Sequence, residues 1–375
     1  KTPVKNLANY ISEKEKLLLY VPNSDEEQFD EEAAKNKIAF SSFHQAKGRE
    51  RKCVILFGID ATYTKFYCRG KIPLRCPNSI YVALTRAKEF MLIIHSAGYD
   101  FLNFSDPRRI KDYANCISVG YIGDPKEVTP QPPKVPSSVT NLLRHQPNEL
   151  LDSLYESLEE YVNVYPGESI ITPDKSYEDG YAELVGDIIG LAIVLYYEYS
   201  INKTCSIMSI YNNPKLSENL RYSINTNNKL ETEIIRLAIH HNCIMSGYIH
   251  KKNQIKRLDF INQQSFDKIL DRFRLLNISK NAKYEYPVSR VIQSTDIKGS
   301  IDCLDRDNGI VWEFKFTKKL TRAHSLQLAC YAAMLAGKED ISGLRFILYN
   351  LRTGELRELP RSENHIKNFT NIINK

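Results

Sequence analysis

Alternation of apolar and polar residues predicts a hairpin near the C-terminal end of the sequence. From residue 310 to 316 every second position is apolar, which is typical of a strand with one buried face. Glu313 and Lys315 fall on its other face, so the acid and the lysine project side by side. A short strand ending at Asp302 precedes it, and Asn-Gly at positions 308 and 309 is a strong hairpin signal. The pattern therefore predicts that Asp302 lies beside Glu313.

Apolar runs elsewhere divide the sequence into two predicted domains. Residues 54–57 form a continuous apolar run, as in a strand that is buried on both faces. A helix and a second apolar strand, over residues 90–94, are predicted after it. Residues 1–122 therefore predict a parallel α/β layer. Residues 123–137 are rich in proline and predict a semi-rigid linker. Residues 138–375 then form the second domain.

Composition and charge limit the kinds of function. The 375 residues suffice for two or three domains, and no apolar run reaches membrane-spanning or secretory length. The eight cysteines have no Cys-x-x-Cys spacing, which favours reduced thiols in an intracellular protein that is neither secreted nor bound to a membrane. The net charge of +6 permits a nucleic-acid partner. Because the sequence begins with Lys1 and not Met, we expect a fragment, a processed product or a trimmed chain.

The predicted hairpin brings together groups that suit phosphodiester chemistry. Two adjacent carboxylates, Asp302 and Glu313, repel each other unless a cation lies between them. Hard oxygen ligands favour Mg²⁺ or Mn²⁺. Lys315 offers a positive charge for a phosphate oxygen or an attacking water, which suits metal-assisted hydrolysis. The alternative is an exposed hairpin with scattered charges, which the acid-x-lysine pattern alone would favour.

The longer pattern resembles a known nuclease family. Gly-Ser-Ile-Asp ending at Asp302, a hairpin with Glu313-x-Lys315, and Gln327-x-x-x-Tyr331 resemble the RecB-type branch of the PD-(D/E)XK nucleases. The resemblance covers roughly residues 183–350. It implies that Asp302 and Glu313 bind metal, that Lys315 is the catalytic lysine, and that Gln327 and Tyr331 share a helix face.

The resemblance also implies a third metal ligand on a preceding helix, which we predict over residues 178–197. Glu183 is our candidate. Asp187 shares its face and stays an alternative. In the Gly-x-x-x-His form of the motif, Gly190 takes the histidine position and the ligand is absent. Glu285, on a predicted strand before the hairpin, is either an ordinary strand residue or a neighbour of the metals.

A basic patch follows the predicted active strand. Lys318, Lys319 and Arg322, with His324, would suit the phosphates of an incoming DNA strand. Some RecB-type nucleases hold an iron–sulfur cluster through cysteines near the C-terminus. This sequence has no cysteine after Cys330, so we predict no iron–sulfur cluster.

Two stretches in the first domain resemble a helicase motor. His-Gln-Ala-Lys-Gly-x-Glu at residues 44–50 and Tyr-Val-Ala-Leu-Thr-Arg-Ala at residues 81–87 resemble motifs V and VI of UvrD/Rep-type superfamily 1 helicases. This resemblance covers about residues 3–96. It implies the C-terminal part of the second RecA-like domain of a motor that uses ATP.

The helicase resemblance assigns roles to particular residues. Arg86 would contact the γ-phosphate of ATP, Gly48 and Glu50 would lie near the nucleotide, and Ser42 and His44 would lie toward DNA. The sequence has no Gly-x-x-x-x-Gly-Lys-Ser/Thr loop to hold the phosphates and Mg²⁺. We therefore expect no ATP hydrolysis by this chain alone. The first motor domain would lie upstream in the same protein or on a partner subunit.

These observations predict an α/β protein in which a partial RecA-like parallel domain precedes a PD-(D/E)XK nuclease domain. We expect a helicase–nuclease fragment that hydrolyses DNA phosphodiesters with Mg²⁺ or Mn²⁺, with a preference for single strands or ends. Its setting would be DNA repair, recombination or replication, in a large DNA virus or other mobile element. The alternative is a non-catalytic DNA-binding module with a degenerate nuclease fold.

Overall fold

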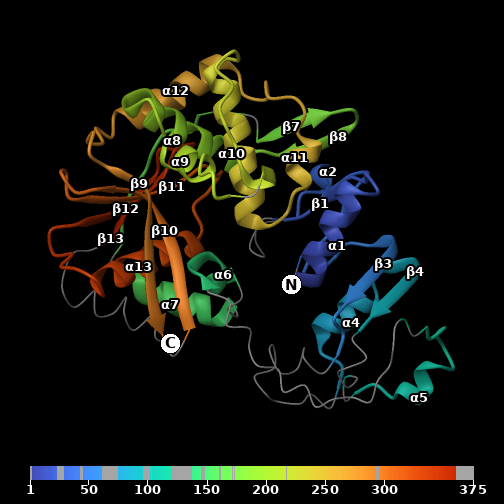
Figure 1. Cartoon of the computed structure of the whole chain (residues 1–375). Helices are drawn as coiled ribbons and strands as arrows, with labels where there is room; N and C mark the ends of the chain where they lie inside the picture. Colours follow the sequence, from blue (N-terminus) through green and yellow to red (C-terminus); the bar gives the residue numbers. More distant parts are fainter. Residues whose placement is uncertain are drawn as a thin grey trace. The chain divides into compact units, whose positions relative to one another are not determined.

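The computed structural model divides the chain into two compact units. It describes residues 2–22, 29–42, 45–60, 75–95, 102, 104–117, 119, 137–144, 148–159, 162–170, 172, 174–216, 218–292 and 295–359. The larger unit comprises Lys1–Tyr20, Asp30–Ile38 and Lys134–Lys375, and the smaller comprises Val21–Phe29 and Ala39–Pro133. Both mix helices with strands (Figure 1), so the chain has a mixed α/β fold. The predicted linker lies almost wholly outside the described residues.

The smaller unit is built on a pair of parallel strands. Strand β3 (Arg51–Phe57) pairs in parallel with β4 (Ala87–Ile94), and helix α4 (Asn78–Leu84) lies between them in the sequence, followed by the short α5 (Pro107–Ile110). A small apolar cluster joins Leu56 of β3 to Ile80 of α4. Our prediction that β3 is buried on both faces is wrong. Ile55 is 56% exposed and Phe90 68%, because among the described residues this cluster covers one face of the pair only.

The N-terminal elements belong to the larger unit, which differs from the predicted boundary at residue 122. They are α1 (Thr2–Glu13), β1 (Leu19–Tyr20) and α2 (Glu31–Ala34), and the division between the units falls within β2 (Ile38–Ala39). The side-chain amide of Gln254 explains part of this grouping. It accepts a hydrogen bond from the backbone N–H of Leu19, at 2.8 Å, and donates one to the Leu19 carbonyl, at 3.0 Å. Residues near the N-terminus are thereby fixed to residues more than 200 positions later.

A seven-stranded sheet forms the centre of the larger unit. Its order is β5-β10-β11-β12-β13-β6, with β9 paired to β10. The strands are β5 (Ser137–Ser138), β6 (Asn163–Tyr165), β9 (Lys283–Ile292), β10 (Thr295–Asp305), β11 (Ile310–Lys315), β12 (Arg345–Asn350) and β13 (Leu356–Leu359). A separate hairpin consists of β7 (Lys175–Glu178) and β8 (Tyr181–Leu184).

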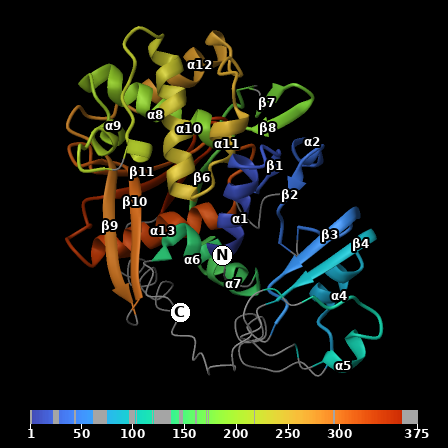
Figure 2. The same ribbon diagram turned by 45° about the vertical axis from the view of Figure 1, so that its right-hand side comes forward.

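Helices cover both faces of this sheet. They are α6 (Val139–Arg144), α7 (Asn148–Glu159), α8 (Gly186–Asn202), α9 (Ser206–Tyr211), the 3₁₀ turn η1 (Glu218–Leu220), α10 (Leu230–Ser246), α11 (His250–Gln254), α12 (Gln263–Arg274) and α13 (Arg322–Ala336). Figure 2 shows α8, α9, α10 and α12 on one side of the strands and α6, α7 and α13 on the other. Two apolar clusters fill these layers.

The crossover from β11 to β12 decides which side chains face α13. These strands are parallel neighbours, with Glu313 opposite Leu348, and α13 connects them. Parallel neighbours require such a connection. Val311 and Leu348 pack in the cluster that contains α13, whereas Trp312 and Phe314 pack in the cluster that contains α8. Because strand side chains alternate, Glu313 and Lys315 lie on the α13 side.

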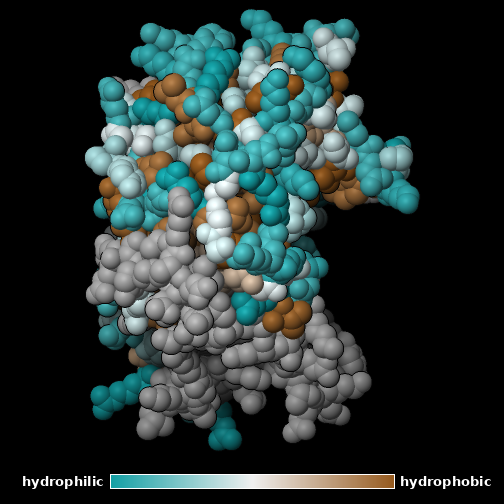
Figure 3. Space-filling model, turned by 90° about the vertical axis from the view of Figure 1, so that its left-hand side faces the viewer, coloured by the Kyte–Doolittle hydropathy of each residue, from teal (hydrophilic) through white to brown (hydrophobic). Residues whose placement is uncertain are grey.

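The surface drawn in Figure 3 mixes hydrophilic residues with small groups of hydrophobic ones. Scattered apolar side chains are usual on protein surfaces. Within the described part of the chain, no helix is both long enough and apolar enough to cross a membrane.

Candidate active site

Asp302 and Glu313 face each other across the hairpin of β10 and β11. Cys303 pairs with Trp312 in this antiparallel ladder, so one step along the register places Asp302 opposite Glu313. Directly opposite residues project from the same face of the sheet. The Asp302 carboxylate also accepts a hydrogen bond from the backbone N–H of Phe314, with 2.7 Å between Oδ2 and N. The predicted hairpin is therefore present, and its two acids are neighbours.

Lys315 completes a charged group with the two acids. Its Nζ lies 2.6 Å from Oε1 of Glu313, two residues earlier on the same face of β11. The Glu313 side chain is 1% exposed and that of Lys315 20%, so the lysine closes the carboxylate off from solvent. Burial lowers the pKa of Lys315, but the charges of Glu313 and Asp302 outweigh it and the net pKa is raised. The lysine is therefore a stable cation beside the acids.

A single lysine does not satisfy both carboxylates. Burial raises the pKa of Glu313, and the charge of Asp302 raises it further. Burial also raises the pKa of Asp302. Oε2 of Glu313 is buried and has no hydrogen-bond partner in the part of the chain that the structure describes. Such an atom costs roughly 1–3 kcal/mol, and more when it is charged.

This environment fits a hard divalent cation. Mg²⁺ is commonly bound through one or two carboxylates while it keeps several waters, and Mn²⁺ accepts similar oxygen ligands. Asp302 and Glu313 supply the carboxylates, and the unpartnered Oε2 of Glu313 supplies an oxygen that needs a cation. Across the described ranges, no group of three or more His, Cys, Asp or Glu side chains is arranged to hold a metal. The pair is thus an open site with two carboxylates.

Glu285 lies close to this site, since the pairs Ile301–Tyr286 and Cys303–Tyr284 place it opposite Asp302, and the backbone of β9 is irregular there. Its φ is +48°, in the left-handed region that few residues other than glycine adopt. Tyr284 and Tyr286, which a regular strand would place on one face, pack in different apolar clusters. Burial raises the pKa of Glu285, and the charge of Asp302 raises it further. Of the two roles left open for Glu285, the position beside Asp302 is the one observed.

Helix α13 presents Gln327 and Tyr331 to the same face of the sheet. Nε2 of Gln327 donates to the hydroxyl oxygen of Tyr331, at 3.0 Å. A Cβ added to Gly299 on β10 would lie 2.5 Å from Cε1 of Tyr331, so the ring packs directly on this glycine. Burial, followed by the charge of Glu313, raises the pKa of Tyr331 well above its usual value. The two acids, Lys315 and this tyrosine therefore lie together.

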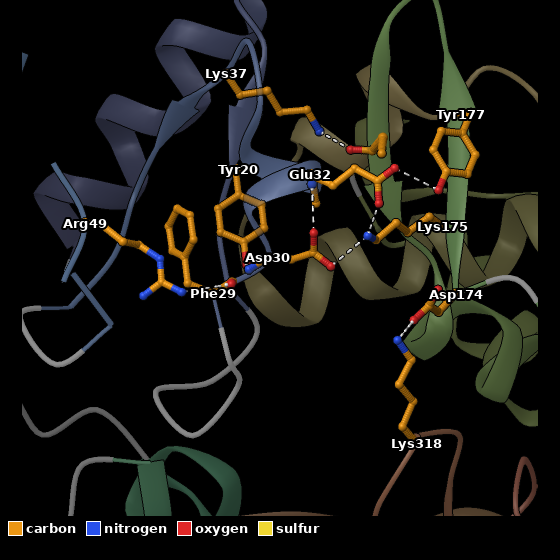
Figure 4. A network of polar contacts seen from close by, with 12 residues as sticks. Tyr20, Phe29, Asp30, Glu32, Lys37, Arg49, Asp174, Lys175, Tyr177 and Lys318 are labelled. Atoms are coloured by element: carbon orange, nitrogen blue, oxygen red, sulfur yellow. Dashed lines mark hydrogen bonds and ion pairs between the residues drawn. The ribbon is translucent and has the colours of Figure 1, made fainter. Parts of the chain in front are cut away.

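Glu183 lies elsewhere, and the helix predicted over residues 178–197 begins too early. Asp-Gly at positions 179 and 180, both with positive φ, forms the two-residue turn between β7 and β8, and Glu183 lies on β8. Its Oε1 accepts hydrogen bonds from Nζ of Lys37 and Nε2 of Gln254. Figure 4 shows Lys37 directed toward this hairpin. Glu183 therefore forms a buried ion pair, and among the described residues it makes no metal-binding group with Asp302 and Glu313.

The two alternative positions on α8, Asp187 and Gly190, are also engaged in other contacts. Asp187 forms an ion pair with Lys251, at 2.8 Å, and accepts a hydrogen bond from Nδ2 of Asn242, at 2.7 Å. A Cβ added to Gly190 would lie 2.7 Å from Cβ of Phe316. The helix therefore packs directly against the end of β11, and position 190 has room for no side chain. Neither Asp187 nor position 190 therefore offers an unengaged ligand in this structure.

The predicted basic patch is partly neutralised. Lys318 forms an exposed ion pair with Asp174, at 2.6 Å, which Figure 4 also shows. Arg322 forms an ion pair with Asp152. Lys319 is exposed. Exposed pairs of this kind contribute about 0–1 kcal/mol, so a phosphate can displace them at low cost.

The smaller unit contains the residues that we expect near ATP. Gly48 has a φ of +79°, which favours glycine. Glu50 forms an exposed ion pair with Lys88, at 3.1 Å. Nε of Arg86 donates to the carbonyl oxygen of Val82, at 2.8 Å. The guanidinium of Arg86 therefore folds back onto the C-terminal end of α4.

The two helicase-like stretches meet at the start of the parallel pair. The backbone N–H of Arg51, which follows Glu50, donates to the carbonyl oxygen of Arg86, at 3.0 Å. The backbone N–H of Ser42 donates a hydrogen bond to Oε1 of Gln45, at 3.2 Å. His44 lies outside the described residues. The structure thus brings Glu50 and Arg86 into neighbouring segments.

Asn350 is a supporting residue that the sequence did not indicate. It is fully buried and pairs with Lys315 in the parallel ladder. Its Nδ2 donates to the carbonyl oxygen of Thr317, at 2.8 Å, and its Oδ1 accepts from the Thr317 N–H, at 3.3 Å. The chain that leaves the active strand is thereby fixed. A single asparagine at the end of a strand is too common to reveal such a contact.

Comparison of the sequence with models of protein families, and with curated proteins, finds no match.

Proposed function

We propose that the larger unit is a metal-dependent deoxyribonuclease of the RecB-like PD-(D/E)XK type. The observation that carries this proposal is the carboxylate of Glu313. It is buried, it lies opposite Asp302 and against Lys315, and one of its oxygens has no partner in the described part of the chain. A fold that needed only stability would place an apolar side chain here.

Each residue has a distinct part in the proposed reaction. Asp302 and Glu313 would hold Mg²⁺ or Mn²⁺, which when bound polarises the phosphodiester and activates water. Lys315 supplies a fixed positive charge beside them, which offsets charge that develops on the phosphate. The backbone N–H of Phe314 orients Asp302. Tyr331 closes the site on the α13 side and is held by Gln327.

The alternative is a DNA-binding module that does not cut. The observation in its favour is the arrangement of α8, where Asp187 is paired with Lys251 and Gly190 has no room for a ligand. With Glu183 also engaged, none of the three candidate positions before the hairpin adds a ligand to Asp302 and Glu313. Metal binding would then be weak, and the nuclease-like surface would bind a DNA strand without cleaving it.

We further propose that the smaller unit is part of a RecA-like helicase motor. Its parallel pair and the proximity of Glu50 to Arg86 support this proposal. ATP would bind only together with the missing motor half, in the same protein or on a partner subunit, since the phosphate loop is absent from the sequence. The proposed setting is DNA repair, recombination or replication.

The nuclease proposal predicts different defects for its acids and its lysine. Cleavage of labelled single-stranded DNA should require Mg²⁺ or Mn²⁺. Lys315→Met should reduce cleavage by about 100- to 1,000-fold, the usual effect of removing one charge-stabilising group, while Mn²⁺ binding persists. Glu313→Gln and Asp302→Asn should lose both cleavage and Mn²⁺ binding. Calorimetry with Mn²⁺, beside the cleavage assay, measures the two effects separately.

Lys338→Met is the matched control, because this exposed lysine lies outside the site. Full activity in Lys315→Met would remove the lysine from the reaction. A wild-type chain that binds DNA but stays inert in both metals would favour the binding module.

A further inference from the structure

His324 lies in the first turn of α13, on the face that carries Gln327 and Tyr331. Positions three and seven residues apart on a helix share a face. The charge of Lys315 acts on the imidazole, as does that of Arg357 on β13. The sequence grouped this residue with the exposed basic patch. In the structure it lies on the helix face of Gln327 and Tyr331, and the charge of Lys315 on β11 reaches its ring.

One ring nitrogen of His324 is committed to the start of the helix. The backbone N–H of Thr321 donates a hydrogen bond to Nδ1, at 3.1 Å. Because Nδ1 accepts, the proton of the neutral ring must reside on Nε2. Burial lowers the pKa of His324 to about 3, with Lys315 and Arg357 as further causes. At neutral pH the ring is therefore an uncharged group whose Nε2–H is a donor.

The other nitrogen is available to a ligand. Among the residues that the structure describes, the ring has no hydrogen-bond partner besides Thr321. The positive charges of Lys315 and Arg357 both act on the ring. A neutral donor near two cations suits an anion with several oxygens, because one oxygen can accept from the ring while the cations offset the charge.

We propose that His324 is a substrate-binding residue that donates its Nε2–H to a non-bridging phosphate oxygen of a nucleic-acid strand. The inference rests on the proposed function, since the strand is the one whose phosphate lies beside Lys315. His324 would hold this phosphate from the α13 side while the two acids face it from the sheet. Cleavage position along the strand would then depend on this contact.

Three variants separate this role from helix capping. His324→Gln keeps an acceptor for the Thr321 N–H and also offers a donor. His324→Glu keeps the acceptor but has no donor, and His324→Leu has neither. Binding of a labelled single-stranded oligonucleotide in Ca²⁺, without cleavage, should weaken about 10- to 100-fold in the Glu and Leu variants, the usual effect of losing one hydrogen bond to a charged group. The Gln variant should stay within about threefold of wild type.

Urea unfolding of each variant identifies any loss that follows from stability. In ¹⁵N-histidine-labelled protein, the Nε2 resonance that disappears in His324→Gln should shift when the oligonucleotide is added. Equal binding by all variants, with wild-type cleavage intact, would overturn the role of His324 and leave the nuclease standing. If oligonucleotide binding depends on His324 but the wild-type chain never cleaves, the role of His324 stands and the nuclease proposal is overturned. A wild-type chain that neither binds nor cleaves overturns both.

Discussion

Two buried carboxylates of the active hairpin, Asp305 and Glu313, show how partners decide the charge of a side chain. Both are almost completely buried. Burial alone would raise both pKa values. At Asp305 the hydrogen bonds from Ser279 and Asn308 outweigh burial, and the pKa is lowered. Glu313 lacks comparable donors and its pKa is raised. Asp305 therefore stabilises the turn, whereas Glu313 lies in an unfavourable environment.

Asp305 gives a prediction at the residue scale. Because its folded pKa is lower than its unfolded value of about 3.9, its stabilising effect is present above that value and is lost as pH falls through the folded pKa. Asp305→Asn should lower the free energy of unfolding at pH 7, and the gap to wild type should close as the pH falls below about 4. Urea unfolding across this range measures the gap.

Asp307→Asn, in the exposed part of the same turn, controls for the loss of one negative charge. A gap at Asp305 that stays constant down to pH 2 would mean that the carboxylate is not what holds Ser279 and Asn308.

At the scale of elements, the close approach of α13 to β10 gives the second prediction. Gly299→Ala would place a Cβ 2.5 Å from the ring of Tyr331. We expect a destabilisation of about 1–3 kcal/mol, the usual cost of overpacking, together with reduced cleavage as the ring is displaced. In a Tyr331→Ala background the same change should cost almost nothing, because the clashing ring is gone.

Gly343→Ala is the matched control, since a Cβ there meets nothing within 4 Å. Additive effects of Gly299→Ala and Tyr331→Ala in thermal unfolding would show that the two residues are not in contact.

Local signals predicted the hairpin of the site, and their limits explain what was missed. The alternation around Glu313 lies within the strand that it predicts, and Asn-Gly lies within the hairpin turn that it predicts. Asp-Gly at positions 179 and 180 is an equally local signal for the β7–β8 turn, and reading residues 178–197 as one helix overlooked it. That error placed Glu183 on the wrong element.

Other parts of the site depend on contacts distant in sequence. Asn350 meets Thr317 only because α13 carries the chain from β11 across to β12. His324 comes within reach of the charge of Lys315 for the same reason, and Glu285 comes beside Asp302 through the pairing of β9 with β10. The exposure of Ile55 could not be predicted from the apolar run. An apolar run shows that a strand is suited to burial, but it does not show whether another element packs on each of its faces.

For the whole molecule, the ion pair of Lys37 with Glu183 ties the N-terminal elements to the larger unit. Both side chains are almost completely buried. Burial lowers the pKa of Lys37 and raises that of Glu183, and their mutual attraction opposes both changes. Removal of one partner should therefore leave a buried charge without compensation.

Lys37→Met should lower the free energy of unfolding by about 3–5 kcal/mol, whereas Lys37→Met with Glu183→Leu should be close to neutral. Urea unfolding measures both. Lys35→Met, an exposed lysine two residues earlier, is the control. A double variant as unstable as the single one would show that packing of the lysine stem, and not charge, joins these elements.

The unpartnered oxygen of Glu313 also has an evolutionary consequence. Replacing a buried ionic group by an apolar side chain of similar size is often neutral or stabilising. Substitutions such as Glu313→Leu would then abolish the proposed chemistry and make the folded protein more stable. Mutational drift would fix such substitutions once selection for cleavage stopped, since selection against unstable proteins would not oppose them. Under the proposed function, an acid at position 313 is therefore expected to persist only while cleavage is under selection.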